Sequence, residues 1–151
     1  IEIVALEQKL SMTQTVTGIS GPVTYKGTVD RVDRYNGKIR VLDYKTGQLN
    51  DLGVTDWADL ALDPELGQAR QLLMYAMLWN THHPDNPAVR AGIIALKQYK
   101  KGVLYVGEKS SPRGKISSAL DTTQMQKAAT AFEQLIQALF DPSSPFSEPD
   151  A

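Results

Sequence analysis

The carboxylates of two aspartates, Asp30 and Asp43, are predicted to meet across a β-hairpin. Segment 27–47 has two runs rich in β-branched and apolar residues, separated by Asn36-Gly37. This pair is typical of the type I′ turn that closes a two-residue hairpin loop. With this turn, the numbers of opposed residues sum to 73, which places Asp30 opposite Asp43. Opposed Cβ atoms lie about 4.5–5.5 Å apart, so the carboxylates would repel each other unless a cation binds them.

Lys45 follows Asp43 by two residues and therefore projects from the same face of the strand. Carboxylate oxygens suit Mg²⁺ or Mn²⁺, and a lysine beside the ion can hold a phosphate oxygen or a water. The three residues indicate metal-assisted hydrolysis of a phosphodiester. Two other interpretations are open: a solvated patch neutralised by Lys45, and a structural calcium site. A β-bulge would shift the register and weaken the argument.

The same residues form two motifs that resemble the PD-(D/E)XK nuclease superfamily, most closely its RecB-like exonuclease branch, with the AddA/AddB helicase-nucleases and the CRISPR adaptation nucleases. They are Gly27-x-x-Asp30-Arg31-x-Asp33 and Asp43-Tyr44-Lys45-Thr46-Gly47. The resemblance implies that Asp30, Asp43 and the backbone carbonyl of Tyr44 bind Mg²⁺ (or Mn²⁺). It further implies that Asp30, Asp43 and Lys45 are catalytic, and that Lys45 aids water activation and stabilises transition-state charge.

The resemblance extends to Gln71 and Tyr75, which match a Gln-x-x-x-Tyr motif in a following helix. Residues 65–80 are apolar on nearly all sides, which is typical of a buried helix. Gln71 and Tyr75 lie four residues apart and share a face. The resemblance implies that they position DNA or the metal shell; hydrogen bonds to neighbouring backbone are the alternative. Gln68, one turn earlier, is a weaker candidate.

Lys97, Lys100 and Lys101 form the densest basic cluster, around Tyr99. We predict that Lys100 and Lys101, at the turn between two strands, contact DNA phosphates. A charged turn also keeps a hairpin soluble, and the sequence does not decide between these two roles.

Three further features invite a functional interpretation. Glu7 is a candidate third metal ligand, although the hairpin register does not place it near Asp30, and a structural role is favoured. Trp57 is able to stack on a base, but a lone tryptophan in a loop more often anchors that loop. The pair His82-His83 is a poor metal site, because adjacent residues rarely converge on one ion.

Composition sets bounds on the chain. From its length, we expect residues 1–151 to form a single domain. We also expect this domain to be excised from a longer protein, since the chain does not begin with Met. A net charge of −1 gives no overall basic signature for nucleic acid. The absence of cysteine excludes disulfides and thiolate-bound metals within the span and fits a cytoplasmic location. No apolar run has the length of a membrane span, so no membrane partner is expected.

We predict an α/β fold with a restriction-endonuclease-like core: a mixed central sheet flanked by helices. The expected strands cover residues 2–18, 23–46, 91–98 and 103–108; a loop covers 47–64, and a last helix starts at Asp121 with Gln124 as a capping-box partner. The expected function is an Mg²⁺-dependent exonuclease in DNA repair or recombination, with DNA and a helicase subunit or helicase domain as partners. The alternative is a nuclease-like domain that binds DNA or a partner without cutting. The resemblance also implies an upstream helix that nothing here matches and a cysteine-rich region beyond the chain.

Overall fold

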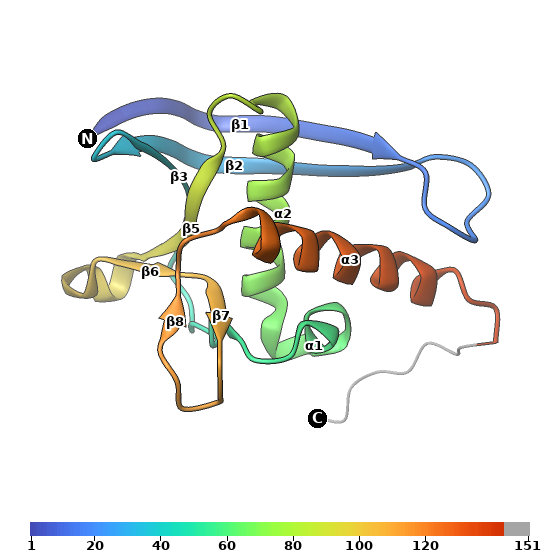
Figure 1. Ribbon diagram of the computed structural model, residues 1–151. Helices are drawn as coiled ribbons and strands as arrows, with labels where there is room; N and C mark the ends of the chain where they lie inside the picture. The colour runs from blue at the N-terminus through green and yellow to red at the C-terminus, as the bar shows by residue number, and fades with distance from the viewer. Residues whose placement is uncertain (144–151) are drawn as a thin grey trace.

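The computed structural model describes residues 1–143, and its centre is a five-stranded mixed sheet in the order β1-β2-β3-β5-β6. The antiparallel pairs are β1 with β2, β2 with β3, and β5 with β6, whereas β3 and β5 are parallel. Figure 1 shows β1 and β2 as a long hairpin across the top of the molecule. The strands are β1 (Glu2–Gln14), β2 (Val23–Tyr35), β3 (Lys38–Lys45), β5 (Ala88–Ala95) and β6 (Val103–Tyr105).

The predicted hairpin turn is confirmed. Asn36 and Gly37 have φ angles of 50° and 77°, the positive values that a type I′ turn requires. The β2–β3 register runs from Tyr35 opposite Lys38 to Arg31 opposite Leu42, so every pair sums to 73, as predicted. The opening region forms one strand, β1, that ends at Gln14 rather than at residue 18.

Helix α2 (Gly67–His82) is the crossover between the parallel strands β3 and β5. Parallel neighbouring strands need a crossover of this kind, because a tight turn joins only antiparallel strands. The helix packs against four strands of the sheet and supplies much of the apolar core, as its composition predicted. Its buried residues are Ala69, Leu72, Leu73, Ala76, Leu78 and Trp79.

Helix α3 (Thr122–Leu139) packs on α1 (Trp57–Leu62), on α2 and on the β1–β2 hairpin. At the hairpin, Phe132 meets Tyr25 with ring centroids 6.5 Å apart. Asp121 caps the helix as predicted, since its carboxylate accepts from the amide of Gln124 at 2.8 Å. The reciprocal half of the capping box is absent. The Gln124 side chain instead donates to the carbonyls of Ser117 and Ala119.

The expected loop 47–64 is partly helical, so this prediction was wrong. It contains β4 (Gly53–Val54) and α1 (Trp57–Leu62), and a 3₁₀ helix, η1 (Pro64–Leu66), follows it. Two acids of this segment cap these helices: Asp56 accepts from the amide of Ala58, and Asp63 accepts from that of Glu65. N-cap carboxylates satisfy helix amides that otherwise lack partners, which the composition of the segment did not reveal.

The prediction of a strand over 91–98 was wrong at its C-terminal end. Strand β5 ends at Ala95, and the next six residues form a 3₁₀ helix, η2 (Leu96–Lys101). The predicted strand 103–108 is divided between two sheets. Its second half, β7 (Gly107–Lys109), pairs with β4 and β8 (Ile116–Ser117) in a small three-stranded sheet.

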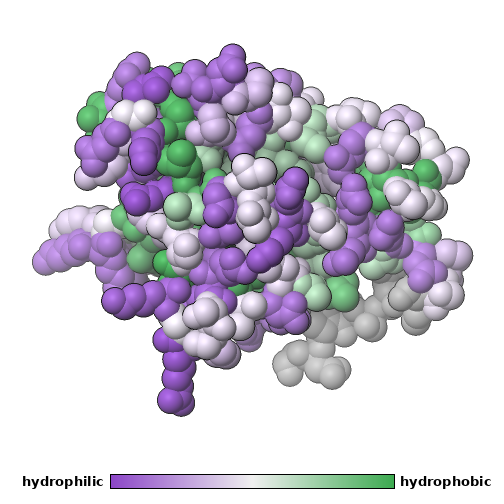
Figure 2. Space-filling model, viewed as in Figure 1, coloured by the Kyte–Doolittle hydropathy of each residue, from purple (hydrophilic) through white to green (hydrophobic). Residues whose placement is uncertain are grey.

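The α/β arrangement, a mixed sheet flanked by helices, confirms the predicted fold class and is consistent with a restriction-endonuclease-like core. Hydrophilic side chains, in purple, dominate the face shown in Figure 2, and hydrophobic ones, in green, appear in small groups. None of the helices within residues 1–143 is long and apolar enough to cross a membrane.

Candidate active site

Asp30 lies where strands β2 and β3 separate. Regular pairing stops at Arg31 opposite Leu42, and the amide of Tyr44 donates to the Asp30 carboxylate at 2.9 Å. In a continuous β2–β3 ladder, the Tyr44 amide would donate to a backbone carbonyl of β2; here it donates to the Asp30 side chain instead. This bond holds the Asp30 carboxylate beside the Asp43 end of β3.

The alternation of side chains breaks at the same point. Val29 and Val32 both belong to the core under the sheet, although regular alternation would put residues three apart on opposite faces. The break lies opposite Glu7, which has a φ of 47°, a conformation rare for a residue with a side chain. No residue is inserted there, since Leu6–Arg31 and Gln8–Val29 keep one register. The local irregularity therefore turns Asp30 toward the α2 side without shifting the pairing.

Asp43 is a buried carboxylate, 4% exposed, with one oxygen left without a hydrogen bond. That oxygen, Oδ2, lies 2.9 Å from Nζ of Lys45, a distance that makes an ion pair. The ion pair compensates part of the negative charge, but Oδ2 has no partner with full hydrogen-bond geometry. Burial raises the pKa of Asp43, and the neighbouring Asp30 raises it further, against the opposing effect of Lys45.

This buried oxygen, which lacks a hydrogen bond and lies next to a second carboxylate, is an arrangement that a hard divalent cation would complete. Within residues 1–143, no three acidic or histidine side chains are grouped closely enough to hold a metal. Asp30 and Asp43 therefore fit such an ion only together with backbone carbonyl or water oxygens.

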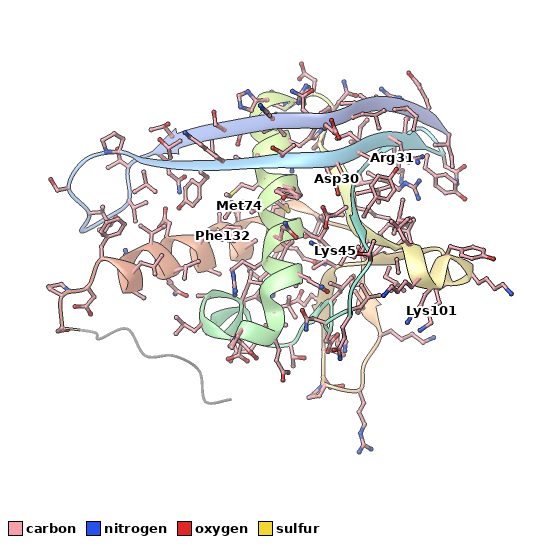
Figure 3. The ribbon with its side chains drawn as sticks, turned by 180° about the vertical axis from the view of Figure 1, so that it is seen from behind. Asp30, Arg31, Lys45, Met74, Lys101 and Phe132 are labelled. Atoms are coloured by element: carbon pink, nitrogen blue, oxygen red, sulfur yellow. The ribbon has the colours of Figure 1, made fainter. Side chains whose placement is uncertain are left out.

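A chain of hydrogen bonds connects Lys45 to helix α2. Nζ of Lys45 donates to Oε1 of Gln71 at 3.0 Å, and Nε2 of Gln71 donates to the Tyr75 hydroxyl at 2.9 Å. Burial raises the pKa of Tyr75, and so does the negative charge of Asp43. The predicted pair on α2 thus lies beside the acids and uses side-chain partners. Figure 3 shows Asp30 and Lys45 on adjacent strands next to α2.

Gly27 provides the space for Tyr75, a role that sequence reasoning missed. A Cβ atom at position 27 would lie 2.6 Å from Cε1 of Tyr75, and Leu78 lies on the same side. Such a contact is far inside the optimal carbon–carbon separation of about 3.5–4.0 Å. The only available signal was the glycine itself, in a strand where glycine often marks a close approach.

Gln68 is not part of the hydrogen-bond chain to Lys45. It accepts from the amide of Asn50 at 2.8 Å and donates to the carbonyl of Gln48 at 3.1 Å. These two bonds tie the segment after β3 to helix α2. The weaker candidate for DNA positioning is thus a loop clamp.

Glu7 lines a cavity of about 450 Å³ together with Leu6, Asp30 and Tyr44. Its side chain is exposed, and no hydrogen bond or ion pair of its side chain is found in the described part of the chain. The structure brings Glu7 closer to Asp30 than the hairpin register alone indicated. Direct metal binding by Glu7 stays a prediction.

A buried ion-pair network lies behind the acids. Arg40 donates to both oxygens of Asp33 at 2.8 Å, and Arg31 contacts Asp33 at 2.9 Å and the Tyr44 hydroxyl at 3.5 Å. Although burial alone would raise it, the pKa of Asp33 is lowered by Arg40 and Arg31. Asp33 lies opposite Arg40, as the predicted register requires, and the network connects β2 to β3 beside Asp30.

The remaining candidates belong to other elements than the acids. Lys100 and Lys101 are in η2 rather than in a hairpin turn. Trp57 donates to Glu108 at 3.1 Å, which anchors its segment. His82 contacts the carbonyl of Ser11, and the ring of His83 stacks on Trp79.

Comparisons with known proteins address the family of this chain. A search of curated proteins gave no match. A solved structure described as "Crystal structure of SSO0001" is 17% identical, with a TM-score of 0.41, over 94% of this chain and 62% of that one. The chain thus spans less than two thirds of the length of that protein. The model of the PD-(D/E)XK nuclease superfamily matches residues 1–150, and the chain therefore belongs to that superfamily.

Proposed function

We propose that this chain is a metal-dependent DNA nuclease domain of the RecB-like branch and hydrolyses phosphodiester bonds as an exonuclease. The observation that carries the proposal is the state of the Asp43 Oδ2 atom. This atom is buried next to Asp30 and Lys45 and has no hydrogen bond. The ion pair with Lys45 leaves this oxygen without a hydrogen bond, whereas buried polar groups are normally satisfied. The superfamily membership and the RecB-like motifs support the same conclusion.

Asp30, Asp43 and the backbone carbonyl of Tyr44 would hold Mg²⁺ or Mn²⁺ in this proposal. When bound, the ion supplies positive charge for the phosphate oxygens and makes water a stronger nucleophile at neutral pH. The amide of Tyr44 holds the Asp30 carboxylate in place before any ion arrives. Burial and the neighbouring Asp30 raise the pKa of Asp43 against the opposing effect of Lys45, so its negative charge is only partly compensated.

Lys45 would stabilise the charge that develops on the phosphate. Its ammonium group has three N–H donors, of which one is donated to Gln71. The ammonium group also faces Asp43 in the ion pair, which leaves a donor for a phosphate oxygen or for the attacking water. Because Gln71 is itself held by Tyr75, the ammonium is positioned before substrate binds, the condition under which such electrostatic stabilisation is most effective.

A calorimetric titration with Mg²⁺ and Mn²⁺ tests the metal site. We expect the wild type to bind at least one of these ions at millimolar concentration or below and Asp43→Asn to bind neither. Asp51→Asn is a matched control, since it makes the same change at an exposed aspartate that pairs with Lys109 outside the site. A wild type that binds neither ion would refute the catalytic proposal for this chain.

Cleavage of end-labelled DNA, single- and double-stranded, tests the activity. We expect Lys45→Ala to lower the rate by about 10²–10³, the usual cost of removing one transition-state donor. Lys109→Ala is the control, because Lys109 pairs with Asp51 outside the site. Linear and circular substrates distinguish exonuclease from endonuclease action. Equal rates for Lys45→Ala and the wild type would contradict the assigned role.

The second candidate function is DNA or partner binding without cleavage. The observation that favours it is the pair of carboxylates without a third acid or histidine among residues 1–143. This candidate predicts DNA binding that is insensitive to Mg²⁺ and to Asp43→Asn. In either case we propose DNA as the ligand, in repair or recombination, and a helicase subunit or helicase domain as the partner.

A further inference from the structure

The 3₁₀ helix η2 presents one exposed aromatic ring among three lysines. Tyr99 is 71% exposed and Leu96 is 49% exposed, both high values for residues of their size. Lys97, Lys100 and Lys101 flank Tyr99 in sequence, and no ion pair within residues 1–143 involves any of them. The segment is therefore an uncompensated basic surface with an unpacked ring at its centre.

The position of η2 connects this surface to the candidate active site. Strands β3 and β5 are parallel, and Lys45 at the end of β3 pairs with Ala95 at the end of β5. Helix η2 begins at Leu96, directly after β5. It therefore starts at the end of the sheet where β3 ends with Lys45. Figure 3 shows Lys45 close to the base of η2, with Lys101 on η2 beyond it. In Figure 2, hydrophilic side chains project at the left, where Figure 1 places η2.

We propose that η2 binds a single-stranded segment of nucleic acid next to the acids, with Tyr99 stacked on a base and Lys100 and Lys101 on phosphates. The inference rests on the proposed function and specifies its substrate as a strand with unpaired bases. Stacking on an aromatic ring requires a base whose face is free, and in a duplex the neighbouring pairs cover that face. Lysines contact phosphates of either form, so the ring is the feature that favours a single strand.

Fluorescence anisotropy in EDTA tests the proposal, because binding is then measured without cleavage. The probes are a labelled single strand of about 16 nucleotides, the upper end of common site sizes, and a blunt duplex of the same sequence. We expect Tyr99→Ala to weaken single-strand binding by about tenfold and to leave duplex binding unchanged. Tyr99→Phe keeps a ring that can stack and should bind like the wild type. Phe140→Ala is the matched control, since Phe140 is 63% exposed at the end of α3, away from η2 in Figure 1.

The lysines are tested by the salt dependence of binding. The double variant Lys100→Gln with Lys101→Gln should lower the slope of log K against log salt by about 1.4, or about 0.7 for each lost contact with a single strand. The same charge change on the β1–β2 hairpin, Lys9→Gln with Lys26→Gln, should leave the slope unchanged. Both variants should keep the melting temperature of the wild type, because all four side chains are exposed.

Several results would overturn this inference. For Tyr99→Ala, they are single-strand binding as tight as that of the wild type, or an equal loss of affinity for single strand and duplex. For the wild type, they are a preference for duplex or no binding of either probe. Failure of the proposed function looks different. Absence of metal-dependent cleavage, with Tyr99-dependent single-strand binding intact, would refute the nuclease and leave η2 as a nucleic-acid site.

Discussion

Replacing Asp43 by asparagine should stabilise the metal-free protein while destroying its metal site. The carboxylate is 4% exposed, its Oδ2 atom has no hydrogen bond, and Asp30 adds a second negative charge beside it. An amide has nearly the same shape and carries no charge. Asp43→Asn thus removes the repulsion while leaving the packing of β3 intact.

The expected gain is small but measurable. An unsatisfied buried polar group costs about 1–3 kcal/mol, and the amide recovers part of that cost. The loss of the ion pair with Lys45 opposes the gain by about 1 kcal/mol or less, since the Lys45 side chain is 27% exposed and keeps Gln71 as a partner. We expect a net stabilisation of about 1 kcal/mol, which is about 2–4 °C in Tm for a domain of this size.

Added metal should make the wild type more stable than Asp43→Asn, which reverses the order of their Tm values. A ligand that binds only the folded wild type at about 100 times its Kd stabilises it by about 2.7 kcal/mol. Asp43→Asn gains nothing if the site is lost. Thermal unfolding by circular dichroism, in EDTA and in Mn²⁺, therefore gives opposite signs for the difference in Tm.

The pH dependence follows from the raised pKa of Asp43. The protonated carboxyl favours folding, so its stabilising contribution is fully present below the unfolded pKa, about 3.9 for aspartate, and is lost as pH rises through the folded pKa. The advantage of Asp43→Asn should thus be largest at neutral pH and shrink toward acid. A wild type that is equally or more stable in EDTA at neutral pH would refute the reasoning.

Asp33→Asn is the internal control, since it is expected to lower the stability of the metal-free protein, whereas Asp43→Asn is expected to raise it. The pKa of Asp33 is lowered despite its burial because Arg40 and Arg31 donate to it. Its contribution to stability is present above the unfolded pKa and lost as pH falls through the folded one. Removing one partner of a buried ion pair costs about 3–5 kcal/mol, so Asp33→Asn should unfold at a much lower temperature at neutral pH.

Three further predictions concern positions that hold the site together. Gly27→Ala places a methyl group against the Tyr75 ring and should cost about 1–3 kcal/mol of stability in urea unfolding, as overpacking does; it should also slow cleavage, and unchanged stability would mean that the ring moves freely. Gln68→Ala removes two bonds to the segment after β3 and should speed hydrogen exchange at the Asn50 amide, whereas unchanged protection would contradict the clamp. Gly37→Ala should lower stability by about 1–2 kcal/mol, because φ is 77° there, and a neutral result would argue against the type I′ turn.

Features that depend on neighbours in sequence were predictable. Asn36-Gly37 determined the turn, and the turn determined the register as far as Arg31 opposite Leu42. Contrary to the prediction, Asp30 and Asp43 are not a pair of that ladder but interact just beyond its end. The apolar composition of α2 indicated burial, and Asp121 indicated the start of α3. The catalytic roles of these residues stay predictions, since geometry places side chains without showing what they do.

Only the tertiary structure decided which partners the site residues have. Parallel pairing of β3 with β5 joins residues about fifty positions apart and brings η2 next to Lys45. The bond from Lys45 to Gln71 and the space that Gly27 leaves for Tyr75 depend on how α2 crosses the sheet. No local pattern encodes such contacts, because they form when separately determined elements pack against one another and buried polar groups take the partners within reach.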